Sequence, residues 1–127
     1  MTMILIFRIM ALRGARLLNK DVLVTAGKLV NDSSAQVRRE VAISIRGDNS
    51  IEAADLWTKL AQQYDGKDRW YLEALGISRK ETGIFTSANG ERVWAAHGTR
   101  RPGRDIVWRS RSRAAMPLLA DLIKNVE

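Results

Sequence analysis

Residues 32–77 read DSSAQVRREVAISIRGDNSIEAADLWTKLAQQYDGKDRWYLEALGI. In the first part of this stretch, apolar residues recur at the spacing that places them on one face of an α-helix: Val37, Val41, Ala42 and Ile45. The middle part carries a second stripe of the same kind: Ala53, Trp57, Leu60, Ala61 and Tyr64. Turn sequences at 47–50 and 65–67 separate the segments. The stretch therefore predicts three helices joined by two turns.

A polar residue suited to cap a helix stands at the start of each predicted segment. Ser33, with Gln36 three residues later, matches a capping box, in which the hydroxyl accepts a free helix N–H and the amide reaches back. The next helix is expected to begin at Asn49 or Ser50, with Glu52 near its third position as a second capping box. Asp68 opens the third helix and places a negative charge at its positive end.

The two outer helices read as copies of one another. Val37-Arg38 aligns with Asp68-Arg69, and Val41 aligns with Leu72. The offset is about thirty residues, the length of one helical hairpin in repeat arrays. We interpret the Asp and Arg residues as devices that set the register between repeats. The positions expected to define the repeat are Asp32, Val37, Arg38, Val41, Asp68, Arg69, Trp70 and Leu72.

Two segments of this stretch resemble a known family. VRREVAISIR at 37–46, preceded by DSSAQ, resembles the first helix of a HEAT-type repeat. DGKDRWYLEALGI at 65–77 resembles part of the HEAT-like region of large planctomycete-type proteins, which join a dehydrogenase-like propeller, helical repeats and a c-type haem domain. This chain has no Cys, so the Cys-x-x-Cys-His haem attachment is missing and the family's redox chemistry is not expected here.

The resemblance implies an all-α fold of HEAT or armadillo type. Residues 1–127 would form a single domain, a short right-handed α-solenoid of three to four antiparallel helix pairs. The resemblance also implies that this domain is a segment of a larger repeat array, serving as a helical spacer in a multidomain protein.

Helices are predicted on both sides of the central stretch. The helix at 3–18 is expected to expose three arginines and to turn its apolar residues inward: Ile4, Phe7, Met10 or Ala11, Leu17 and Leu18. The exposed arginines would be Arg8, Arg13 and Arg16. A second helix covers 22–30, completing a hairpin.

Beyond Ile77 the pattern weakens. Helices are predicted at 84–97, 105–109 and 114–126. The composition of 97–103 indicates a loop, because Pro102 disfavours helical geometry at the residue before it.

Composition limits the functions open to this chain. It has 127 residues, 46% of them hydrophobic, no Cys, and a formal net charge of +7. The lack of Cys excludes disulfides, thiolate metal sites and thiol catalysis. The single histidine, His97, makes neither a metal cluster nor a triad, and no phosphate-binding loop or dinucleotide fingerprint occurs. We therefore expect no enzyme, no catalytic residue, no metal, no cofactor and no small-molecule substrate. We also expect neither a signal peptide nor a membrane span.

A basic cluster is the sharpest functional feature of the sequence. Its members are Arg92, Arg100, Arg101, Arg104, Arg109, Arg111 and Arg113. Their guanidinium groups are suited to phosphate or carboxylate oxygens. Trp94 and Trp108, nearby in the sequence, are suited to stack with a base or a guanidinium. The alternative is that the arginines pair with acids of a neighbouring hairpin while both Trp side chains are buried.

A second group, Trp57, Tyr64, Trp70 and Tyr71, flanks the 65–67 turn. It fits either a ligand pocket or core packing. We interpret it as core, because Asp65 and Asp68 already have capping roles beside it.

Two functions remain open. The leading expectation is a non-enzymatic scaffold that binds a protein partner or a neighbouring domain of a parent protein. The alternative is a nucleic-acid-binding HEAT-like domain that uses the basic cluster to contact phosphates, without reading base sequence. HEAT-like DNA glycosylases show such a fold on DNA, although no match to their active site occurs here.

Overall fold

The computed structural model describes residues 2–48, 50–79, 101–110, 120 and 124. All regular secondary structure in these residues is helical, so the chain is all-α, as predicted. The helices are α1 (Thr2–Leu18), α2 (Val22–Leu29), α3 (Ala35–Ser44), α4 (Ile51–Gln62), α5 (Arg69–Arg79) and α7 (Arg101–Ser110). The predicted helices at 84–97 and 114–126 lie outside the described residues.

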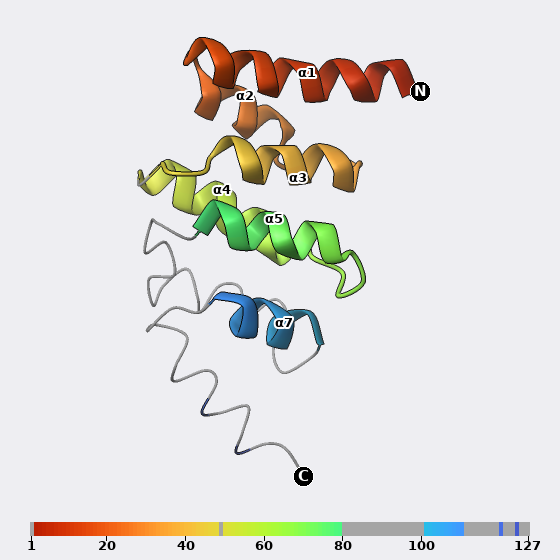
Figure 1. Cartoon of the computed structure of the whole chain (residues 1–127), viewed down its shortest axis with the longest axis vertical. Helices are drawn as coiled ribbons and strands as arrows, with labels where there is room; N and C mark the ends of the chain where they lie inside the picture. The colour runs from red at the N-terminus through yellow and green to blue at the C-terminus, as the bar shows by residue number, and fades with distance from the viewer. Residues whose placement is uncertain (1, 49, 80–100, 111–119, 121–123, 125–127) are drawn as a thin grey trace.

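The helices form two rows. In the first row α1 contacts α3, α3 contacts α5, and α5 contacts α7. In the second row α2 contacts α4, and both pack against α3. Figure 1 shows the first row as helices stacked one below another, with α2 and α4 on one side of it. Helices of the first row therefore present a continuous surface away from the second row.

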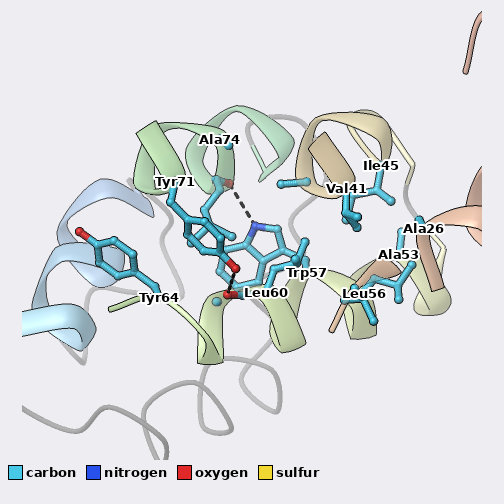
Figure 2. Packing of buried hydrophobic residues seen from close by; sticks show 14 of the residues in the cluster. Ala26, Val41, Ile45, Ala53, Leu56, Trp57, Leu60, Tyr64, Tyr71 and Ala74 are labelled. Carbon is cyan, nitrogen blue, oxygen red and sulfur yellow. Dashed lines mark hydrogen bonds between the residues drawn. The ribbon is translucent and has the colours of Figure 1, made fainter. Parts of the chain in front are cut away.

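The core lies between the two rows. Its apolar side chains come from α3, α4 and α5 above all, and Trp57 at its centre is 1% exposed. The indole Nε1 of Trp57 donates a 3.0 Å hydrogen bond to the carbonyl of Leu75, and the hydroxyl of Tyr71 donates a 2.7 Å bond to the carbonyl of Leu60 (Figure 2). Both polar groups are therefore satisfied although their rings are buried. The stripes predicted for α3 and α4 are the ones that are buried.

The helix N-termini are capped differently from one another. Ser50 caps α4 as predicted, its hydroxyl accepting a 3.2 Å bond from the N–H of Ala53. The capping box predicted from Ser33 and Gln36 is wrong. The N-cap of α3 is Ser34, which makes no side-chain capping bond, and the carboxylate of Asp32 instead accepts the N–H of Ser34 at 2.8 Å.

The prediction for the buried face of α1 is wrong. All six residues named as inward are exposed: Ile4, Phe7, Met10, Leu17 and Leu18 are each 57% exposed or more, and Ala11 is exposed as well. Among the described side chains of α1, Leu12 is the buried one. Apolar residues occur on both sides of this helix, so their periodicity fits either face. Leu12 packs into the core in the observed orientation, while Arg8 and Arg13 form ion pairs with Asp32 and Glu40. Arg13 and Arg16 are exposed, as predicted, and Arg8 is half-buried.

The loop predicted at 97–103 is wrong for its last three residues. Arg101, Pro102 and Gly103 belong to α7, which also extends beyond the short helix predicted at 105–109. Pro102 lies in the first turn, where its missing N–H has no helical acceptor and its fixed φ suits a helix. Its ring packs against Gly66, whose φ of +82° shapes the turn before α5.

Candidate surface site

Helices α3 and α5 match each other at an offset of 34 residues, and not at the predicted offset of about thirty. The N-caps of α3 and α5 are Ser34 and Asp68, and Asp68 accepts the N–H of Tyr71 at 3.1 Å. Aligning the caps pairs Val37 with Tyr71 and Val41 with Leu75, and all four side chains are buried. The predicted alignment of Val37-Arg38 with Asp68-Arg69, and of Val41 with Leu72, is therefore wrong, because it matched Arg to Arg instead of cap to cap.

Two buried serines support the alignment by caps. Ser44 and Ser78 are 34 positions apart, as are the two caps. The hydroxyl of Ser44 donates to the carbonyl three residues before it at 2.7 Å, and the hydroxyl of Ser78 does the same at 3.0 Å. The same residue type makes the same bond at the same place in both helices.

Asp32 joins α1 to α3. Its carboxylate lies 3.2 Å from Nε of Arg8, close enough for an ion pair although the N–H is not aligned as a hydrogen bond. Its carbonyl accepts a 2.7 Å hydrogen bond from Nη1 of Arg38. The structure thus brings Asp32 and Arg38 together, through the backbone of Asp32.

Contacts that involve Tyr71 and Tyr64 link α3 to α5 and then to α7. The guanidinium of Arg38 lies over the ring of Tyr71 on α5, and Tyr71 stacks on Tyr64 with centroids 6.0 Å apart. The hydroxyl of Tyr64 bonds a carboxylate oxygen of Asp105 on α7 at 3.2 Å. Burial raises the pKa of the Tyr71 phenol, against the opposing effect of Arg38. These contacts connect α3, α5 and α7 to one another.

Most of the aromatic group is core, as predicted, with one exception. Trp57, Tyr64 and Tyr71 are at most 5% exposed, whereas Trp70 is 72% exposed. Trp70 is the second residue of α5 and points away from the face that carries Tyr71, since adjacent helical residues diverge by about 100°. An exposed Trp requires an explanation, and its surroundings supply one.

Trp70 stands at one end of a groove on the outer surface of the first row. The groove has a volume of about 790 Å³ and crosses α1, α3 and α5. Its lining is Ile9 and Arg13 from α1, Gln36, Arg39, Glu40 and Ile43 from α3, and Arg69, Trp70, Glu73, Ala74 and Ile77 from α5. Of these residues, only Arg69 and Trp70 belong to the repeat positions predicted from the sequence.

The lining of α5 repeats the lining of α3. Each of the four α3 residues has its counterpart 34 positions later, and every counterpart also lines the groove: Gln36 with Trp70, Arg39 with Glu73, Glu40 with Ala74, and Ile43 with Ile77. Helices α3 and α5 therefore line the groove with equivalent faces. Sequence reasoning missed it because the apolar stripes that reveal the core leave this face unmarked.

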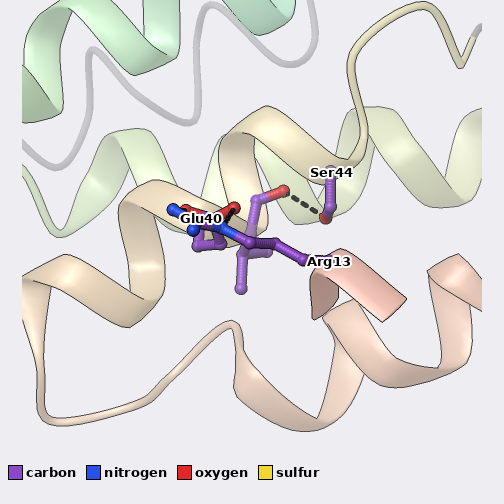
Figure 3. A network of polar contacts seen from close by, with 4 residues as sticks. Arg13, Glu40 and Ser44 are labelled. Carbon is purple, nitrogen blue, oxygen red and sulfur yellow. Dashed lines mark hydrogen bonds and ion pairs between the residues drawn. The ribbon is translucent and has the colours of Figure 1, made fainter. Parts of the chain in front are cut away.

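Charge in the groove is only partly compensated. Arg13 and Glu40 form a two-pronged pair, with Nε to Oε1 at 2.9 Å and Nη2 to Oε2 at 3.3 Å (Figure 3). Glu73 has an interaction of its own. Within the described residues, the side chains of Arg39 and Arg69 form no hydrogen bond or ion pair, so the groove keeps two uncompensated cations.

The predicted basic cluster is largely untested by the structure. Arg92, Arg100, Arg111 and Arg113 lie outside the described residues, as do Trp94 and His97. Arg101 and Arg109 belong to α7, where only their backbone is described, and the side chain of Arg104 is exposed. Only the exposure of Arg104 therefore bears on this prediction.

The described residues hold no group of three His, Cys, Asp or Glu side chains placed to ligate a metal ion. Within the part of the chain that the structure describes, the pKa of Asp65 is lowered, because the N–H of Lys67 donates a 2.7 Å hydrogen bond to its carboxylate. Asp65 also accepts the N–H of Asp68 at 3.1 Å, so it shapes the α4–α5 turn.

No protein-family model matches the chain, and neither curated proteins nor solved structures give a match. None of the described helices is both long and apolar enough to cross a bilayer. Fold and site therefore define the chain as an all-α protein with a groove across three successive helices of one row.

Proposed function

We propose that the chain is a non-enzymatic interaction scaffold of HEAT-like type, a short right-handed α-solenoid that docks a protein partner or a neighbouring domain. The two rows of helices, and the 34-residue spacing of matching positions in α3 and α5, support the repeat architecture. The HEAT resemblance of residues 32–77 agrees with it.

The groove carries the proposal of binding. Monomeric proteins seldom leave a large aromatic side chain exposed beside other apolar groups unless the surface has a partner. Trp70 is 72% exposed and Ile77 is 40% exposed, and both line the same groove. Trp and Arg are also the residues that contribute most energy at protein interfaces, and the groove contains both.

Site-specific photocross-linking tests this proposal. We would replace Trp70 by p-benzoylphenylalanine and irradiate the protein in an extract of its source organism. The control carries the same group at Ile51, which is 80% exposed but begins α4 in the other row. We expect a discrete protein product from position 70 alone. Identical products from both positions would contradict docking at the groove, and a turnover activity abolished by one substitution would contradict a non-enzymatic role.

A nucleic-acid-binding role is the second candidate. The net charge of +7 and the exposed side chain of Arg104 favour it. Fluorescence anisotropy with a labelled duplex, from low to physiological salt, tests it. Binding that falls steeply with salt, and that is lost when Arg100, Arg101 and Arg104 are replaced by Ala, would place this function first. Absence of binding at low salt would exclude it.

A further inference from the structure

We propose that the groove across α1, α3 and α5 receives an acidic peptide segment that carries bulky apolar side chains. The inference rests on the proposed function and names the chemistry of its partner. It follows from the two uncompensated arginines of the groove and from the apolar groups at its two ends.

The arginines supply the electrostatic part of the argument. Arg13 is neutralised by Glu40, and Glu73 is also engaged, whereas Arg39 and Arg69 form no hydrogen bond or ion pair with another described residue. Arg39 is half-buried and Arg69 is exposed, so both guanidinium groups are open to a ligand from the surface. A guanidinium binds a carboxylate through two parallel N–H groups, which gives geometric selection as well as attraction.

The apolar groups of the groove set the spacing expected between the apolar side chains of the peptide. Trp70 lies near the start of α5, and Ile77 lies seven residues later on the same helix. Seven helical residues rise about 10 Å, close to the roughly 9 Å turn of a polyproline II segment, which has three residues per turn. Because every third side chain of such a segment lies on the same face, a peptide with apolar side chains at every third position would reach Trp70 and Ile77 at once. Ile43, at the matching position of α3, also lines the groove.

Charge complementarity separates this occupant from two others. A second copy of the chain also carries +7, so it brings like charge to the groove. A nucleic acid brings a phosphate at every nucleotide, and two carboxylates, Glu40 and Glu73, stand in the lining. A peptide can place its carboxylates opposite Arg39 and Arg69 and neutral residues elsewhere.

The test measures binding of a short fluorescein-labelled peptide of Glu, Ser and Leu, with Leu at every third position, by fluorescence polarisation. A peptide with Lys in place of Glu is the charge control. We expect the acidic peptide to bind and the basic one not to bind. Replacing Trp70 by Ala should weaken the acidic complex at least about tenfold, as expected for a central aromatic anchor.

Charge reversal localises the binding. The double variant Arg39→Glu with Arg69→Glu should weaken the acidic peptide at least about tenfold. Its matched control is Lys28→Glu with Lys59→Glu, which changes the net charge equally at exposed positions of α2 and α4. The control should shift the affinity no more than about twofold, since exposed charges outside an interface are screened. The single variant Arg69→Glu, at an exposed position, covers the case in which the half-buried Arg39 is needed for folding.

Three results would overturn the inference. The first is that the acidic and basic peptides bind with equal affinity. The second is that the two double variants weaken the acidic peptide equally. The third is that single-stranded DNA displaces the acidic peptide and itself requires Arg39 and Arg69 for binding. If the acidic peptide fails while cross-links at position 70 still appear, the scaffold function stands and only the acidic partner is excluded.

Discussion

The guanidinium of Arg38 lies over the ring of Tyr71, 5.5 Å from its centroid, and so joins α3 to α5. The same guanidinium donates a hydrogen bond to the carbonyl of Asp32 at 2.7 Å. One side chain therefore holds the turn before its own helix and the helix next in the row. Substitutions that remove such contacts between a side chain and a neighbouring turn or helix test what holds the row together.

Replacing Arg38 by Met should lower the free energy of unfolding by about 2 kcal/mol. A charged hydrogen bond contributes about 1.5–3 kcal/mol and an exposed cation–π contact about 0.5–1 kcal/mol, while the Met side chain retains part of the packing. Urea denaturation measures the change. The matched control is Arg46→Met, at an exposed position just beyond α3, where we expect less than about 0.5 kcal/mol. Equal effects at the two positions would mean that Arg38 does not connect the helices.

Replacing Gly66 by Ala should destabilise the protein more than replacing Gly47 by Ala. Both glycines have positive φ, +82° and +80°, so an added Cβ costs about 1–2 kcal/mol at either position. At Gly66 the new Cβ would also lie 2.9 Å from Cγ of Pro102, whereas nothing lies within 4 Å at Gly47.

The two substitutions therefore separate backbone strain from the clash. We expect Gly66→Ala to be worse by at least about 1 kcal/mol, the lower range for inserting an atom into a packed site. Thermal and urea unfolding of the two variants give the comparison. Indistinguishable stabilities would argue against the contact between the α4–α5 turn and the start of α7.

Tyr71 should make stability fall at alkaline pH. Burial raises the pKa of its phenol above the ordinary value of 10.0, so the unfolded chain loses this proton first. Because the unfolded state then binds fewer protons, the stability contributed by Tyr71 is complete below about pH 10 and is lost as pH rises through the raised pKa.

The variant Tyr71→Phe isolates this effect. At neutral pH it should be less stable by about 1 kcal/mol, because the bond from the hydroxyl to the carbonyl of Leu60 is lost. The difference between the variant and the natural chain should shrink above pH 10. A difference that stays constant with pH would show that the phenol titrates equally in both states.

The two faces of α1 should respond very differently to truncation. Leu12 is fully buried, so Leu12→Ala should cost about 3 kcal/mol through lost transfer energy and a cavity. Phe7 is 63% exposed, and Phe7→Ala should change stability by less than about 1 kcal/mol. Urea unfolding of both variants tests the assigned orientation, which the reverse ranking would contradict.

The sequence predicted best those helices that carry a single apolar stripe. In α4, every residue of the predicted stripe from Ala53 to Tyr64 is buried, and the predicted cap Ser50 is formed. On this helix, periodicity and local hydrogen bonding point to the same arrangement, so no information from distant residues is needed.

Elsewhere the deciding contacts join residues far apart in the sequence. In α1, apolar residues occupy both faces, and contacts with distant residues select one: Leu12 packs into the core, Arg8 pairs with Asp32, and Arg13 pairs with Glu40. The groove was not predicted for a related reason. Its residues on three helices become neighbours only through packing of the first row, and Trp70 was grouped with the core because it is aromatic.

The matching of groove residues in α3 and α5 has a consequence for engineering. Since each helix supplies the same four lining positions, the surface is modular in units of 34 residues. Duplicating residues 35–68 would add one more helix to the row and lengthen the binding surface by one interhelical spacing, about 8–10 Å. The number of 34-residue units would then set the length of the binding surface, whereas the side chains of each unit would set what it binds.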